Sequence, residues 1–162
     1  MKEQNHLPMY GVGPMYVIVC VLATVTGILL TKAGLLNTGN IAEWKILCII
    51  AGILLIIVGA YLWIASVLIQ KVQKNIEENR LATTGVYAWV RNPIYSGIVM
   101  VLTGILLLFH NVWLFVLPMF FWLFMTLLMK ATEEKWLKEM YGKEYEDYCK
   151  KVNRCIPWFP KR

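Results

Sequence analysis

Charged residues are scarce in this chain of 162 residues, and where they are missing says more than how many there are. They make up 16% of the sequence, against 59% hydrophobic residues, whereas an average soluble domain carries about 25% charge. Three stretches, 4–31, 46–70 and 92–129, contain no Asp, Glu, Lys or Arg at all. This distribution excludes an ordinary soluble fold and predicts a membrane protein.

The lengths of the uncharged stretches predict how often the chain crosses the membrane. A helix needs about 20 apolar residues to cross roughly 30 Å of hydrocarbon, so the first two stretches suit one span each. The third would reach roughly 57 Å as one helix, and a helical hairpin turning at His110-Asn111 is therefore expected. We predict an all-α, polytopic fold with four membrane helices whose cores are 14–30, 46–69, 93–109 and 112–129. Pro93 suits the first turn of the third helix, and Pro118 predicts a kink inside the fourth.

Basic residues are nearly absent from one side of this topology. All Lys and Arg residues except Lys32 and Lys45 fall on the side that holds both termini and the 70–91 loop. The positive-inside rule then predicts a cell (inner) membrane protein with both termini in the cytoplasm. The net charge of +6 is concentrated in the C-terminal tail, so the bilayer is the expected partner and no nucleic acid is.

The C-terminal tail has the residue spacing of a cytoplasmic helix lying in the membrane interface. Its apolar and aromatic positions recur at roughly helical intervals, with lysines between them, and Gly142 is expected to interrupt the helix. These positions are Leu137, Met140, Tyr141, Tyr145, Tyr148 and Val152.

Cysteine and histidine are also few, which bears on redox and metal chemistry. The four cysteines show no Cys-x-x-Cys spacing, and two of them, Cys149 and Cys155, fall in the tail assigned to the reducing cytoplasm. Neither a disulfide nor a metal site is expected. His110 lies on the turn at the opposite membrane face from the polar motif below, so it cannot act there as a base, and no catalytic residue is assigned.

Against this background, the 79–97 segment gathers a turn glycine, three aromatics, two arginines and an Asn-Pro step at the edge of the membrane. Arg91-Asn92-Pro93 also reads as an ordinary helix start, in which the Asn is of a capping type and the Pro sits in the first turn.

Glu133 and Glu134 follow the last apolar run on the same side of the membrane. Taken alone, both would be expected to be solvated, or paired with Lys130 or Lys138 at neighbouring helical positions. Their occurrence on the same face as the 79–97 segment favours a binding site instead.

The order of motifs resembles a known enzyme family. The run is Gly85-x-Tyr87-x-x-x-Arg91-Asn92-Pro93-x-Tyr95-x-Gly97, then Glu133-Glu134, then Tyr141-Gly142-x-Glu144-Tyr145-x-x-Tyr148, then Val152-x-Arg154-x-x-Pro157. It is similar to isoprenylcysteine carboxyl methyltransferases and their phospholipid methyltransferase relatives. The resemblance implies one membrane methyltransferase domain over 1–162, with its cofactor-binding and catalytic portion at 71–160.

The resemblance further implies S-adenosylmethionine as cofactor and a hydrophobic or lipidated acceptor. The implied cofactor contacts are Gln73, Asn79, Arg80, Leu81, Ala82, Tyr87, Arg91, Asn92, Pro93, Ile94, Tyr95, Glu133 and Glu134. Lys130 and Arg154 are the candidate substrate contacts. A carboxylate, an arginine and flat aromatic walls suit the ammonium, the carboxylate and the adenine of this cofactor.

Two departures from the family bear on the acceptor. Asn92 stands where the family commonly has histidine, which rules out proton transfer at that position. Met129 and Lys130 stand near the place where eukaryotic members carry an arginine, which argues against prenylcysteine as the substrate. Without a placed histidine, a carboxylate or thiol acceptor is favoured over an ammonium, which must first lose a proton. A phospholipid N-methyltransferase, a membrane reductase and a non-enzymatic membrane adaptor stay open as alternatives.

Overall fold

The computed structural model describes residues 12–69 and 80–159, and helices dominate both ranges. The helices are α1 (Gly13–Lys32), α2 (Lys45–Ile64), α4 (Pro93–Leu107), α5 (Val116–Ala131), α6 (Glu133–Tyr141) and α7 (Lys143–Lys151). Shorter turns are η1 (Asn37–Gly39), η2 (Ala42–Trp44), η3 (Ala65–Ile69, π-helical), η4 (Gly85–Ala88) and η5 (Val112–Phe115). No strand forms in the two described ranges beyond isolated bridges, so the all-α prediction is confirmed.

Each of the four predicted segments contains a helix, but the helices differ in length. Three helical stretches, Gly13–Lys32, Ala42–Ile69 and Val112–Tyr141, are long and apolar enough to cross a membrane. The fourth helix, α4, has 15 residues and therefore extends only about 22 Å, less than the hydrocarbon thickness of roughly 30 Å. The described chain thus has three full-length candidate spans and one shorter apolar helix.

The turn between α4 and α5 lies where the sequence predicted it. His110 has a φ of 38°, and its carbonyl accepts a hydrogen bond from the Ile41 amide at 2.9 Å. The Asn111 side-chain amide donates to the Leu36 carbonyl at 2.8 Å, so the two loops at this end of the bundle are tied together. Pro118 is the third residue of α5, where a helix start leaves its N–H groups unpaired in any case. Pro118 thus lies in the first turn of α5 rather than in its interior, and the kink expected there stays a prediction.

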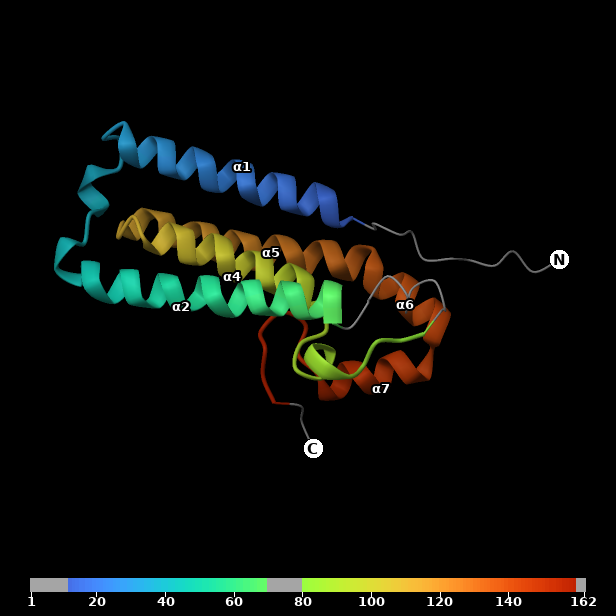
Figure 1. Cartoon of the computed structure of the whole chain (residues 1–162). Helices are drawn as coiled ribbons and strands as arrows, with labels where there is room; N and C mark the ends of the chain where they lie inside the picture. The colour runs from blue at the N-terminus through green and yellow to red at the C-terminus, as the bar shows by residue number, and fades with distance from the viewer. Residues whose placement is uncertain (1–11, 70–79, 160–162) are drawn as a thin grey trace.

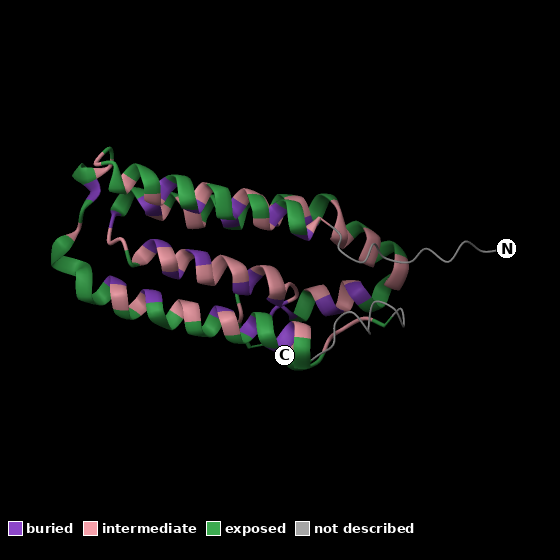
Figure 2. Ribbon diagram, turned by 45° about the horizontal axis from the view of Figure 1, so that its top comes forward, coloured by how far each residue is buried: buried purple, intermediate pink, exposed green. Residues whose placement is uncertain are grey.

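Figure 1 shows α1, α2, α4 and α5 running side by side, with α4 and α5 between α1 and α2. The short helix α4 contacts α1, α2 and α5. The main core lies along α1, α4 and α5 and includes Tyr16, Leu106, Phe121 and Met125. In Figure 2 the outward surfaces of α1, α2 and α5 are largely exposed, and large apolar side chains occupy them. A protein with such an apolar exterior on its long helices is a membrane protein.

The tail forms two helices rather than one, because Gly142 turns the chain with a φ of 52°. Tyr145 and Tyr148, whose spacing suggested an interfacial face, are buried. They pack in a cluster that includes Leu81 and Leu137. At least this aromatic face of α7 therefore meets the protein.

Glycines bring the backbones of α2 and α4 into direct contact. A Cβ atom on Gly59 would lie 2.5 Å from the Gly97 carbonyl oxygen, and a Cβ on Gly97 would lie 2.6 Å from the Gly59 oxygen. About two helical turns away, a Cβ on Gly104 would lie 2.5 Å from the Gly52 oxygen. Small residues at such crossings let membrane helices approach closely and form Cα–H···O contacts. The two pairs fix the antiparallel register of α2 and α4, and with it the position of the start of α4.

We predict that Gly59→Ile lowers the midpoint of thermal unfolding in detergent. The new side chain meets backbone atoms of α4, and overpacking of this kind costs about 1–3 kcal/mol or more. The matched control is Ile57→Phe, which adds bulk to a lipid-facing side chain that is 59% exposed. Near-ultraviolet circular dichroism reads out both variants, and equal midpoints would show that the glycine contact carries no stability.

Candidate functional site

Two segments remote in sequence pair beside the start of α4. Residues 89–92 and 153–158 are joined by three backbone hydrogen bonds, from Arg91 N to Asn153 O (2.8 Å), Asn92 N to Arg154 O (3.3 Å) and Trp158 N to Trp89 O (3.0 Å). The Asn92 side-chain amide also donates to the Arg154 carbonyl, at 3.1 Å. Asn92, which the motif assigned to the cofactor, therefore holds the C-terminal segment in place.

Glu134 is bound by two arginines. Arg154 donates from Nε to Oε1 at 2.5 Å and from Nη2 to Oε2 at 2.9 Å, and Arg91 Nη1 lies 3.2 Å from Oε1. The hydrogen bond to Glu134 raises the pKa of Arg154, so this guanidinium stays charged. Arg91 Nη1 also donates to the Cys149 sulfur at 2.6 Å, which adds α7 to the cluster. We call the group of Arg91, Glu134, Cys149 and Arg154 the arginine cluster.

The alternative reading of the two glutamates is wrong. The Glu134 side chain is only 16% exposed, so it is not solvated. Lys138, the neighbour suggested as its partner, instead pairs with Glu146 at 2.7 Å on the surface. Lys130, the other suggested partner and a candidate substrate contact, is exposed at the end of α5.

Glu133 faces different partners from its neighbour. The Tyr95 hydroxyl donates to Glu133 Oε1 at 2.6 Å. The first turn of α1 closes over this pair, since a Cβ on Gly13 would lie 2.8 Å from the Tyr95 hydroxyl oxygen. Glu133 is the first residue of α6 and follows the uncharged run 92–129, so it lies in the polar end of the Val112–Tyr141 stretch. Burial raises the pKa of Glu133, against the opposing effect of hydrogen bonds from Tyr95 and the Val12 backbone.

No basic side chain pairs with Glu133 within residues 12–69 and 80–159. A buried carboxylate without a cation is costly, because a low-dielectric environment disfavours the charge. This site therefore has the electrostatics of a binding place for a cationic ligand.

Tyr87 lies in the same environment as Glu133. Its side chain is buried against Leu62, Ala65 and Val86, and its carbonyl accepts a hydrogen bond from the Tyr148 hydroxyl at 2.6 Å. Burial raises the pKa of Tyr87, and the charge of Glu133 raises it further. The phenol group of Tyr87 and the carboxylate of Glu133 therefore lie in the same polar region at this end of the bundle.

Ser66 adds an unexpected element to this region. It lies on η3, the π-helical turn that extends α2, and π-helical turns are frequent at functional sites. Its hydroxyl is close enough to Tyr87 to lower the pKa of that residue, yet it completes no hydrogen bond of ordinary geometry with any described residue. Ser96, on α4, is likewise buried without a hydrogen-bond partner for its hydroxyl in that part of the chain.

Ser66 and Ser96 were missed by the motif comparison because the motif does not name them. A signal was nevertheless present, since they are the only two serines in the sequence and both fall in apolar spans.

The remaining motif residues support the site from its edges. Pro93 and Ile94 start α4, and Pro93 is buried. Ala82 packs with the Tyr87 cluster, whereas Leu81 packs with the tyrosines of α7.

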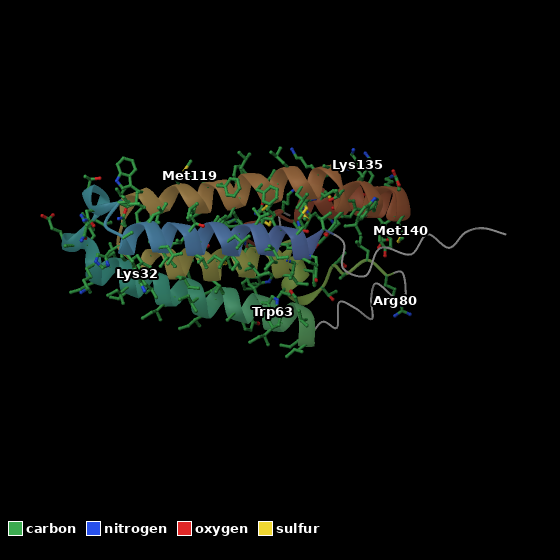
Figure 3. The ribbon with its side chains drawn as sticks, turned by 90° about the horizontal axis from the view of Figure 1, so that it is seen from above. Lys32, Trp63, Arg80, Met119, Lys135 and Met140 are labelled. Carbon is green, nitrogen blue, oxygen red and sulfur yellow. The ribbon has the colours of Figure 1, made fainter. Side chains whose placement is uncertain are left out.

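Three predicted cofactor contacts, Gln73, Asn79 and Arg80, come from the segment between α2 and η4. Arg80 is exposed, and Figure 3 shows it at the same end of the bundle as Lys135 and Met140, opposite Lys32. Gln73 and Asn79 lie outside the described residues.

Comparison with known proteins gives consistent results. The family model described as phospholipid methyltransferase matches residues 47–144. A protein-S-isoprenylcysteine O-methyltransferase of Schizosaccharomyces pombe is 36% identical over 91 residues, which cover 54% of this chain and 37% of that protein. One of the same name from Saccharomyces cerevisiae is 34% identical over 124 residues, covering 69% of this chain and 50% of the relative. No solved structure matches the chain significantly. The chain thus spans half or less of the length of these curated relatives.

We predict that Arg154→Gln destabilises the fold, because it leaves Glu134 with one cation in a largely buried position. Losing one partner of a buried ion pair costs roughly 3 kcal/mol, which should appear as a lower midpoint of thermal unfolding. The control is Lys138→Gln, which breaks the solvent-exposed pair with Glu146 and should leave the midpoint unchanged. Equal midpoints for both variants would mean that the arginine cluster does not hold the C-terminal segment.

Proposed function

Because this chain belongs to the phospholipid methyltransferase family, we propose that it is a membrane methyltransferase that uses S-adenosylmethionine. Its acceptor in this proposal is a hydrophobic or lipidated molecule. The observation that carries the proposal is the Glu133 carboxylate, which is partly buried beside Tyr95 and has no basic partner among the described residues. The names and identities of the two fungal relatives support the same activity.

The described residues fit the proposed cofactor in charge and in hydrogen-bonding capacity. Its methionyl end carries an ammonium, which a buried carboxylate such as Glu133 would bind. Its sulfonium is a cation that the faces of Tyr87 and Tyr95 attract. Its other polar groups need hydrogen-bond partners, and the hydroxyls of Ser66 and Ser96 offer them at the same end of the bundle. Neither hydroxyl completes a hydrogen bond of ordinary geometry with a described residue, and a buried hydroxyl left so costs free energy.

Each set of residues has a distinct task in the proposed reaction. S-adenosylmethionine, when bound, supplies an activated methyl group for in-line displacement by a nucleophile. Glu133 and Tyr95 would fix the orientation of the donor, and the buried Tyr87 would exclude water from it. In this proposal the arginine cluster contributes rigidity: Glu134 is already bound by Arg91 and Arg154, so Glu133 is the glutamate left for the ligand.

The location follows from charge and exposure. We place the site at the cytoplasmic face of the cell membrane, with both termini in the cytoplasm, because nearly all basic residues fall on that side. The exposed Trp89 and Phe159 rings, with centroids 5.6 Å apart, suit the headgroup region beside the site. A hydrophobic acceptor would then reach the site from the bilayer.

The acceptor group is best assigned as a carboxylate. The matching fungal proteins are named as O-methyltransferases of S-isoprenylcysteine, which outweighs the earlier argument against prenylcysteine from Met129 and Lys130. His110 lies on the turn between α4 and α5, away from Glu133, so it is not available to deprotonate an amine. A carboxylate needs no base at neutral pH, whereas an ammonium does.

We predict that Glu133→Gln weakens binding of S-adenosylmethionine about tenfold to hundredfold, as expected for the loss of a hydrogen bond between charged groups. Titration calorimetry of the detergent-solubilised protein measures this. Glu139→Gln, an exposed change on the same helix, is the control and should bind normally.

The same experiment has a pH arm. The raised pKa of Glu133 means that its carboxylate takes up a proton at a higher pH than a solvated glutamate does. Since only the ionised form binds a cation well, the affinity of the native protein should fall as the pH is lowered through this raised pKa. Glu133→Gln should lack that dependence. Saturable binding that is unaffected by the substitution at every pH would exclude Glu133 from the site.

We predict that labelled methyl groups are transferred to a prenylcysteine analogue with a free carboxylate, giving a base-labile ester. Phosphatidylethanolamine, offered in parallel, should remain unlabelled. Label in the phospholipid alone would overturn the carboxylate assignment and favour an N-methyltransferase, as the name of the matching family model allows.

A further inference from the structure

The first turn of α4 holds backbone amides that precede the hydrogen-bond ladder of the helix. The hydrogen-bond ladder of this helix begins with Ser96 N donating to Asn92 O at 2.9 Å, so the amides of Ile94 and Tyr95 precede it. Asn92, the residue in the capping position, gives its side chain to Arg154 O instead. The first turn has no acidic residue and no side-chain cap. The first turn itself therefore carries no side chain that would neutralise the positive end of the helix dipole.

The Ser96 hydroxyl lies on this same turn and breaks a pattern that the rest of the chain follows. Thr24, Thr31 and Thr132 each donate their hydroxyl to the carbonyl four residues earlier. Ser96 does not, although it is only 1% exposed. The Cα–Cβ bonds of a helix tilt toward its N-terminus, so this hydroxyl lies toward the turn that holds the Ile94 and Tyr95 amides. A serine inside a helix normally donates its hydroxyl to a backbone carbonyl of the preceding turn. A buried serine that does not either binds another partner or costs free energy because its hydroxyl is unpaired.

A further donor lies two residues before the helix. The Arg91 side chain is 10% exposed, and its Nε has no acceptor among the described residues, while its Nη1 contacts Glu134 and Cys149. The segment from Arg91 to Ser96 thus combines a guanidinium, two backbone amides and a buried hydroxyl. Such a set of donors suits an anion with planar oxygen acceptors.

From these donors, we propose that the first turn of α4 and the Ser96 hydroxyl form the subsite for a ligand carboxylate. This inference rests on the proposed function and adds Ser96 as a positioning residue of the site. Tyr95, next to Ser96, bonds to Glu133, so an acidic subsite and a donor-rich subsite start from adjacent residues of one helix. An α-amino acid carries an ammonium and a carboxylate on one carbon and matches that pair. The carboxylate belongs to the methyl donor or to the acceptor, and both have one.

The test compares ligands that differ only in the carboxylate. Ser96→Ala should weaken binding of S-adenosylmethionine by about tenfold or more and leave decarboxylated S-adenosylmethionine unaffected. In the second arm, binding of a prenylcysteine free acid is compared with its carboxamide. A loss confined to the acid in this arm would assign the subsite to the acceptor instead. Thr24→Val, which removes a buried hydroxyl in the middle of α1, is the control and should change neither arm.

The outcomes separate this inference from the proposed function. One outcome is that the native protein binds S-adenosylmethionine while Ser96→Ala changes neither arm, or weakens each ligand and its analogue without the carboxylate equally. Either result would show that the carboxylate subsite is wrong, and the methyltransferase proposal would stand. If the native protein binds none of the four ligands, both proposals fail. Ser96→Gly removes the same hydroxyl and replaces Ser96→Ala if the latter unfolds at a lower temperature than the native protein.

Discussion

The ion pairing of Glu134 with Arg91 and Arg154 is the interaction on which the rest of the site depends. These three residues come from the start of α6, the segment before α4 and the C-terminal segment, and their ion pairs join the three. Their contact, with the backbone pairing of 89–92 and 153–158, closes the end of the bundle. Because Glu134 is paired within the protein, its neighbour Glu133 is left partly buried and without a cationic partner in residues 12–69 and 80–159.

The glycine contacts between α2 and α4 place the other half of the site. Gly59 against Gly97 holds the start of α4 next to the end of α2, which brings η3 and Ser66 under Tyr87. Rigid packing in the membrane and ion pairing beyond it thus act on the same few residues. The proposed chemistry, alignment of a methyl donor in a water-poor site, requires this kind of rigidity more than it requires a general base.

Sequence reasoning predicted the helices, the α4–α5 turn and the residues that gather at one end, since uncharged runs and motif order report on these directly. It failed for features that depend on contacts between residues far apart in the sequence. Whether Glu133 or Glu134 is paired within the protein depends on Arg154, which is 20 residues away from Glu134 and on a different segment. The glycine register of α2 and α4 and the burial of Tyr145 and Tyr148 depend on partners that no local pattern names. Pro118 was assigned to a helix interior because the 3₁₀ turn before α5 is invisible in hydropathy.

The central claim, that the buried region around Glu133, Tyr87 and Tyr95 binds the methyl donor, is tested most directly by photo-crosslinking. Labelled S-adenosylmethionine is irradiated with the native protein in nanodiscs, and the labelled peptides are identified by mass spectrometry. Our account predicts label in the peptides that contain residues 87–96 and 133, competed away by excess unlabelled cofactor. Label confined to the loops at the other end, residues 33–44 and 108–115, would contradict it.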